Sequence, residues 1–119
     1  MGDLAVDTAV ESLGDGRYRA QLNQDWEIWG PEGGYVAAIA LRAAGAEARL
    51  HRPASFSCHY LGVASFDAVD LEVTTVRSGR NAESFRVSMT QEGRAILDAT
   101  LWTIGERTCL LYTSDAADE

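Results

Sequence analysis

The stretch GGYVAAIALRAAGAEAR, residues 33–49, limits most strongly what this chain can fold into. The run from Tyr35 to Leu41 carries no charged side chain, and alanines continue the apolar surface beyond Arg42. A helix that is apolar on nearly every side is buried on nearly every side. This stretch is shorter than the about 20 apolar residues that cross a bilayer. We therefore predict a buried helix that strands of this chain, or a partner, must enclose.

The residues at the start of this helix are rich in glycine. Trp29-Gly30-Pro31-Glu32-Gly33-Gly34 precedes the apolar run, and paired glycines let a backbone or a ligand approach closely. The first amide groups of a helix have no intrahelical partner and carry partial positive charge. They suit a carbonyl oxygen that becomes negative during a reaction. The alternative is that the glycine pair only shapes a tight turn.

Alternation of polar and apolar residues predicts five strands around the helix. They cover Arg17–Leu22, Ala54–Leu61, Val69–Val76, Glu83–Gln91 and Arg94–Ile104. Turns are expected at residues 14–16, at residues 78–81 and, as a two-residue hairpin turn, at Glu92-Gly93. Clean alternation is typical of an antiparallel sheet with one covered face. We predict an α+β domain in which a curved antiparallel sheet wraps one long buried helix.

Composition and charge narrow the classes of function. The 119 residues suit a single domain, and the net charge of -8 argues against nucleic acid as a partner. Two cysteines are too few for a disulfide framework. The N-terminus lacks the basic start and apolar run of a signal peptide. We expect a cytoplasmic protein without a membrane span.

The last residues break the pattern of the rest of the chain. The segment CLLYTSDAADE, Cys109–Glu119, resembles the translation of an adapter used in sequencing libraries. Such segments are kept out of fold reasoning. We expect a domain over residues 1–108 and a non-native tail over residues 109–119. The alternative is a short natural acidic tail.

Four motifs together resemble a known family. They are WEIWGPEGGYVAAIALRAA (26–44), HRPASFSCHYL (51–61), FDAVDLEV (66–73) and SFRVSMTQEGR (84–94). The combination is similar to the N-terminal half of acyl-CoA thioesterases of the thioesterase II type, which are double hotdog proteins. The resemblance implies a hotdog fold, in which a curved antiparallel sheet wraps a central helix. It also implies hydrolysis of acyl-CoA to a free acid and coenzyme A, without metal or organic cofactor.

Hydrolysis of a thioester requires an activated water, a polarised carbonyl group and a tunnel for the acyl chain. Gly33 and Gly34 suit the second requirement by their position. Trp26, Trp29, Tyr35 and Tyr60 are candidates to line the acyl site, although aromatic residues at such positions are more often plain core.

A base that activates the water is harder to find. In catalytic hotdog halves of this type an aspartate lies about two turns into the helix, where this chain has Ile39-Ala40-Leu41. Glu32 is a candidate base or an exposed loop carboxylate. His59 is a candidate polar group or proton relay, or a histidine bonded within the sheet. The resemblance implies that the catalytic acid lies on a second hotdog half, which would follow Thr108.

Other assignments remain open. Arg77, Arg80 and Arg86 are candidates for the phosphates of coenzyme A, or they solvate a face of the sheet. The domain could be a non-catalytic module for acyl binding or assembly. A hotdog dehydratase ranks last, because His59 has no obvious aspartate partner. An exposed sheet edge predicts association with the second hotdog half or with another copy of this chain.

Overall fold

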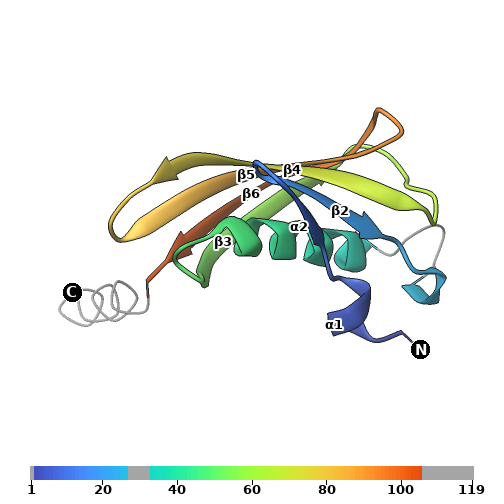
Figure 1. The fold of residues 1–119 in the computed structure, drawn as a ribbon, viewed down its shortest axis with the longest axis horizontal. Coiled ribbons are helices and arrows are strands. Elements are labelled where there is room, and N and C mark those ends of the chain that lie inside the picture. Colours follow the sequence, from blue (N-terminus) through green and yellow to red (C-terminus); the bar gives the residue numbers. More distant parts are fainter. Residues whose placement is uncertain (1, 27–32, 106–119) are drawn as a thin grey trace.

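Helix α2 (Gly33–Glu47) lies along the concave side of a six-stranded antiparallel sheet (Figure 1). This structure is a computed structural model, and it describes residues 2–26 and 33–105. The helix predicted over residues 33–49 is confirmed and ends at Glu47. The hotdog class expected from the sequence is confirmed as well, with one central helix packed against a curved sheet.

Five of the six strands lie where alternation predicted them. The strands are β1 (Glu11–Gly14), β2 (Arg17–Gln21), β3 (Arg52–Tyr60), β4 (Ala68–Ser78), β5 (Ala82–Gln91) and β6 (Arg94–Ile104). Their order across the sheet is β1-β2-β4-β5-β6-β3, and neighbouring strands are antiparallel. β3, which follows the helix in the chain, therefore forms an edge. Pro53 is tolerated within it because an edge strand does not need every N–H group for pairing.

Alternation predicts no strand before Arg17, and here the structure adds one. Short helix α1 (Leu4–Asp7) is capped by the Asp3 side chain. β1 then pairs with β2, and all four of its residues are exposed. Because no side chain of β1 is buried, its sequence shows no alternation that could have revealed it.

The predicted turns are present and have the required backbone. Gly14, Asp15 and Gly16 all have positive φ angles in the β1–β2 turn. Glu92 and Gly93, with φ of 51° and 79°, connect β5 to β6. Two positive φ angles characterise the type I′ hairpin turn, whose twist matches that of the flanking strands.

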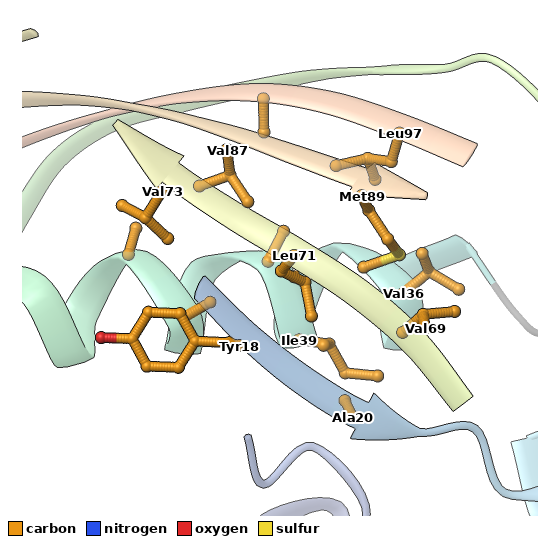
Figure 2. Close-up of a cluster of buried hydrophobic side chains, with 14 of the residues drawn as sticks. Tyr18, Ala20, Val36, Ile39, Val69, Leu71, Val73, Val87, Met89 and Leu97 are labelled. Carbon is orange, nitrogen blue, oxygen red and sulfur yellow. The ribbon is translucent and has the colours of Figure 1, made fainter. Parts of the chain in front are cut away.

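The core lies between α2 and the sheet. Val36 and Ile39 of the helix face Leu71 of β4 and Met89 of β5 (Figure 2). The buried residues of α2 are Tyr35, Val36, Ile39, Ala40, Ala43 and Ala44. The alanines bring the helix backbone close to the sheet, so the fold needs few large side chains on this surface.

The sheet encloses only one side of α2, which corrects the expectation of burial on nearly every side. A stripe at helical spacing on another side is exposed or half-buried. It consists of Gly34, Ala37, Ala38, Leu41 and Gly45, and we call it the open flank. The remaining exposed positions of the helix are Arg42, Ala46 and Glu47. In this chain the enclosure that the apolar helix requires is therefore incomplete.

Two β-bulges change which side chains face the core. Met89 pairs with Leu97, whereas Thr90 pairs with Ala95, so Ile96 is an extra residue in β6. This explains why Ile96 and Leu97 are both buried. In β4, Thr75 pairs with Phe85 and Arg77 with Ser84, so Val76 is extra. A bulge bends its strand and re-aims the side chains that follow.

A buried tyrosine connects the sheet to the end of α2. The Tyr18 hydroxyl donates a hydrogen bond of 2.6 Å to the Glu47 carboxylate. Burial, the bond itself and the negative charge of Glu47 raise the pKa of Tyr18 to about 12. Tyr18 therefore stays neutral over the ordinary pH range.

Candidate functional site

The N-terminus of α2 lies beside the end of edge strand β3. The Tyr60 hydroxyl donates a hydrogen bond of 2.8 Å to the carbonyl oxygen of Gly33. A Cβ atom built on Gly33 would lie only 3.3 Å from that hydroxyl oxygen. Glycine at this position therefore permits the close approach that the sequence suggested. Gly34 follows on the exposed side of the helix. Three of the predicted site residues thus lie together.

Apolar side chains extend this corner of the molecule into solvent. Tyr60, Leu61 and Val63 are 55%, 57% and 70% exposed, and we call them the apolar corner. They follow one another at the end of β3, next to the beginning of the open flank. Contiguous exposed apolar surface marks a place where a ligand or another protein surface binds.

Tyr35, predicted as a substrate contact, is instead a core residue. It is 1% exposed, and its ring stacks on Trp26 with centroids 5.5 Å apart. Its hydroxyl donates to the carbonyl oxygen of Asp7 at 2.8 Å and accepts from the N–H of Asn23 at 2.9 Å. Burial raises the pKa of Tyr35. In this chain the side chain fastens the N-terminal segment to the helix and lines no open surface.

The carboxylate of Asp7 completes this polar network. It accepts hydrogen bonds from the Asn23 side-chain amide at 3.2 Å and from the Trp26 indole N–H at 2.9 Å. Asp7 thereby holds the segment that leads toward the glycine-rich residues. Sequence reasoning missed this role, because nothing in the local pattern relates Asp7 to residues 16 and 19 positions later.

His59 lies on the other face of the sheet. It is exposed and directly opposite Asp98 in the β3–β6 pairing. Asp98 in turn accepts hydrogen bonds of 3.2 and 3.1 Å from Arg86, and this carboxylate raises the pKa of Arg86. No local pattern in the sequence indicates an acid opposite His59. Because these side chains face away from α2, the structure does not bring His59 to Gly34.

The remaining predicted residues are placed as follows. Glu32 and Trp29 lie outside the described residues. The carboxylate within α2 belongs to Glu47, which lies at the end of the helix far from Gly33 and accepts a hydrogen bond from the Tyr18 hydroxyl.

In residues 2–26 and 33–105, no group of three or more His, Cys, Asp or Glu side chains could hold a metal ion. None of the helices in these ranges is long and apolar enough to cross a membrane.

The fold and the corner at Gly33 define the class of the protein, a hotdog domain with an accessible helix N-terminus. Residues 22–104 match the family model of the acyl-CoA thioesterase N-terminal domain, so the chain belongs to that family. A search of curated proteins found no match.

Solved structures agree with this assignment. A candidate thioesterase II of Thermobifida fusca is 30% identical over 86% of this chain and 38% of its own, with a TM-score of 0.83. The tesB protein of Mycobacterium avium subspecies paratuberculosis is 25% identical over 85% of this chain and 41% of its own, with a TM-score of 0.77. This chain therefore spans well under half of either relative.

A third structure shows the same fold in a shorter protein. A hypothetical thioesterase of Streptococcus pneumoniae, solved with coenzyme A, is 24% identical with a TM-score of 0.69. The match covers 81% of this chain and 83% of that protein. At this identity the likeness concerns the fold alone.

Proposed function

We propose that this chain is the N-terminal hotdog half of an acyl-CoA thioesterase, and that the thioester binds at the N-terminus of α2. The observation that carries the proposal is the joint position of Gly33, Gly34 and Tyr60 at an accessible corner beside apolar surface. The reaction class is inferred from membership of the family, and the place of the reaction is inferred from the position of these three residues.

The reaction requires stabilisation of a developing oxyanion. A water oxygen attacks the thioester carbonyl carbon, the C–S bond breaks, and the sulfur leaves with a proton as the thiol of coenzyme A. The products are this thiol and a free acid. We assign the stabilisation of the carbonyl oxygen to the amides of Gly33 and Gly34, since helix N-termini favour negative charge.

We infer that the base comes from outside the described residues. Glu47 lies fourteen residues beyond Gly33, a distance of about 21 Å along the helix axis at 1.5 Å per residue. No carboxylate lies nearer within α2. A second hotdog half that packs on the open flank would bring its own carboxylate toward Gly34. Glu32 remains the alternative base within this chain.

Three features support packing of a second half, or of another copy of the chain, at this side. β3 pairs with β6 and, within the described part of the chain, with no other strand. Native proteins usually cover such an edge. The open flank presents small residues that permit close approach of another helix, and the apolar corner adjoins it. Both larger relatives have chains long enough for a second domain.

We assign the acyl chain to the apolar corner, with Tyr60 at the thioester end. Trp29, which lies outside the described residues, remains a candidate for the same role by its place in the sequence. Coenzyme A is the expected ligand, and the proposed chemistry uses no cofactor. His59 takes no step in it, because its side chain faces the outer surface.

The test compares two substitutions in the intact protein encoded by the complete gene. Gly34→Pro removes one amide N–H, and proline is tolerated in the first helical turn. We expect its kcat to fall about 100-fold or more, as for loss of an oxyanion donor, with a smaller change in KM. Gly34→Ala keeps the N–H and should retain most activity. Equal losses in both variants would contradict the proposal.

The 119-residue chain by itself provides the second test. We expect no release of thiol from acyl-CoA above the buffer rate, because the proposed base is absent. Robust turnover that disappears in Glu32→Ala would overturn the assignment of the base to a second half. The alternative function, a non-catalytic acyl-binding module, is favoured by the composition of α2, in which no carboxylate precedes Glu47. It predicts acyl-CoA binding without hydrolysis in the intact protein too.

A further inference from the structure

The first turn of α2 carries the glycines of the proposed thioester site and, directly after them, the buried side chain of Tyr35. Its hydroxyl donates to the carbonyl oxygen of Asp7 at 2.8 Å and accepts from the backbone N–H of Asn23 at 2.9 Å. Asp7 ends α1 and Asn23 follows strand β2, so two segments outside the helix hold this one hydroxyl group. The start of α2 is thereby tied to the N-terminal segment and to the sheet.

A second set of hydrogen bonds ends on the Asp7 carboxylate. One oxygen accepts from the Asn23 side-chain amide at 3.2 Å, and the other accepts from the Trp26 indole N–H at 2.9 Å. The Trp26 ring in turn stacks on Tyr35, with the two ring planes inclined by 18°. Hydrogen bonds to a carboxylate are stronger than those between neutral groups. Asp7 therefore contacts Tyr35 through its backbone and supports it a second time through Trp26.

The beginning of the chain covers the bond between Asp7 and Trp26. A Cβ atom built on Gly2 would lie 2.5 Å from an Asp7 carboxylate oxygen and 2.6 Å from the Trp26 indole nitrogen. A residue with a side chain could therefore occupy this position only by displacing the bonded pair. A backbone this close also limits the access of water, and a hydrogen bond away from water is electrostatically stronger.

Helix α1 is attached to α2 mainly by polar contacts, because none of its own residues is buried. Arg42 lies two helical turns after Tyr35, on the same side of α2. Its guanidinium group donates hydrogen bonds to the Ala5 carbonyl oxygen and to the Thr8 hydroxyl. α1 therefore lies beside α2, on the helix side of the sheet (Figure 1), and is fixed to it at two points.

The buried surface of α2 does little by itself to fix the helix against rotation. Three of its buried residues are Ala40, Ala43 and Ala44, and methyl groups interlock with a facing surface less than larger side chains do. The position of the first amide groups depends on how the helix is rotated and how far it is shifted along its axis. Directional hydrogen bonds to the first turn constrain both movements.

We propose that Asp7 is a positioning residue for the thioester site, and that it acts through Trp26 and Tyr35. It holds the first turn of α2 so that the amides of Gly33 and Gly34 point at the thioester carbonyl oxygen. In this assignment Asp7 contacts no reacting atom. The inference rests on the function proposed above and adds to that site a residue from a distant segment of the chain.

The kinetic test uses the intact protein encoded by the complete gene. Asp7→Ala removes both acceptor oxygens and should lower kcat about tenfold or more, with a smaller change in KM, because misplaced groups serve the transition state poorly. Asp7→Asn keeps one acceptor oxygen and should lose less. Trp26→Phe keeps the stacked ring without the indole N–H and should also lower kcat. The control Asp25→Asn removes the same charge from an exposed position nearby and should leave kcat unchanged.

A double-mutant cycle separates positioning from a general loss of folding. In a Gly34→Pro background the Gly34 amide has already lost its N–H, so Asp7→Ala should lower kcat by a clearly smaller factor there. A merely structural role would lower kcat by the same factor in both backgrounds, and that result would overturn the inference. A Gly34→Pro variant with unchanged kcat would instead overturn the proposed function.

A second readout does not depend on activity. In the intact protein labelled with ¹⁵N-glycine, the Gly34 amide peak is assigned by its loss in Gly34→Pro. Asp7→Asn should shift this peak, and Asp25→Asn should leave it in place. Unfolding curves establish that each variant is folded, and Asp7→Asn replaces Asp7→Ala in the cycle if Asp7→Ala does not fold. An unmoved Gly34 peak, or equal losses of kcat in Asp7→Asn and Asp25→Asn, would contradict the role of Asp7.

Discussion

At the scale of single residues, Glu83 shows how a buried charge supports this fold. It belongs by alternation to the inward face of β5, together with Phe85 and Val87. Burial disfavours its charge, but hydrogen bonds from Leu50, Ser78 and Arg49 outweigh burial and lower the pKa of the carboxyl. The ionised side chain thereby ties β5 to the connection between α2 and β3.

We predict that Glu83→Gln lowers the free energy of unfolding by about 2 kcal/mol, the magnitude for hydrogen bonds to a charged group. The pKa is lower in the folded state, so this stabilisation is present above the unfolded value of about 4.3 and is lost as the pH falls through the folded pKa. Urea unfolding at a series of acidic pH values measures both effects. The control Glu72→Gln, at an exposed position of β4, should change little. Equal behaviour of the two variants would exclude this role of Glu83.

At the scale of elements, substitution by alanine should have opposite effects on the free energy of unfolding at two glycines that have open space around them. A Cβ atom on Gly45 or on Gly93 would meet no atom within 4 Å, so packing does not decide the outcome. Gly45 lies within α2, where alanine is the better helix former. Gly93 has φ of 79° in the β5–β6 turn, a conformation that alanine adopts only with strain.

We expect Gly45→Ala to raise the free energy of unfolding of this chain by about 0.5–1 kcal/mol. Gly93→Ala should lower it by about 1 kcal/mol. Thermal and urea unfolding of the two variants side by side give both values. Changes of the same sign in both would show that backbone conformation does not control these positions.

At the scale of the whole molecule, α2 is covered by the sheet on one side and open on another. Edge strand β3, the open flank and the apolar corner lie on the part of the surface that we assign to a second hotdog half. A chain that exposes these features together should associate with itself when that half is absent.

We predict that the 119-residue chain forms dimers or larger species in sedimentation experiments at micromolar concentration. Leu41→Lys, which places a charge on the open flank, should shift the population toward monomer. Ala46→Lys adds the same charge at a position that is already exposed and should not. A clean monomer for the unchanged chain would contradict the assigned interface.

Much of the fold follows from local sequence. The apolar run after Gly34 predicted α2, alternation predicted five strands, and Glu92-Gly93 predicted a tight turn. Each of these signals depends on residues that are close in sequence, either within one or two helical turns or within a single strand. β1 was missed for the same reason, because a strand exposed on all its residues carries no periodic signal.

The candidate site was predictable only in part. Glycines at the start of an apolar helix marked the corner, but Tyr60 reached Gly33 only through the position of β3 at the sheet edge. Tyr35 lies only two residues after Gly33 yet faces the core, and its partners Asp7 and Asn23 come from another segment. The pairing of His59 with Asp98 likewise depends on strand register.

By itself, the sequence determined α2, five of the six strands, their hydrophobic faces and the need to cover α2, because these properties arise from neighbouring side chains and backbone preferences. The tertiary structure decided which strand forms the edge, which flank of α2 stays open, and that the bulge at Val76 turns Arg77 outward. Those relations join residues far apart in the chain, and strand order and register, rather than local pattern, determine where they meet.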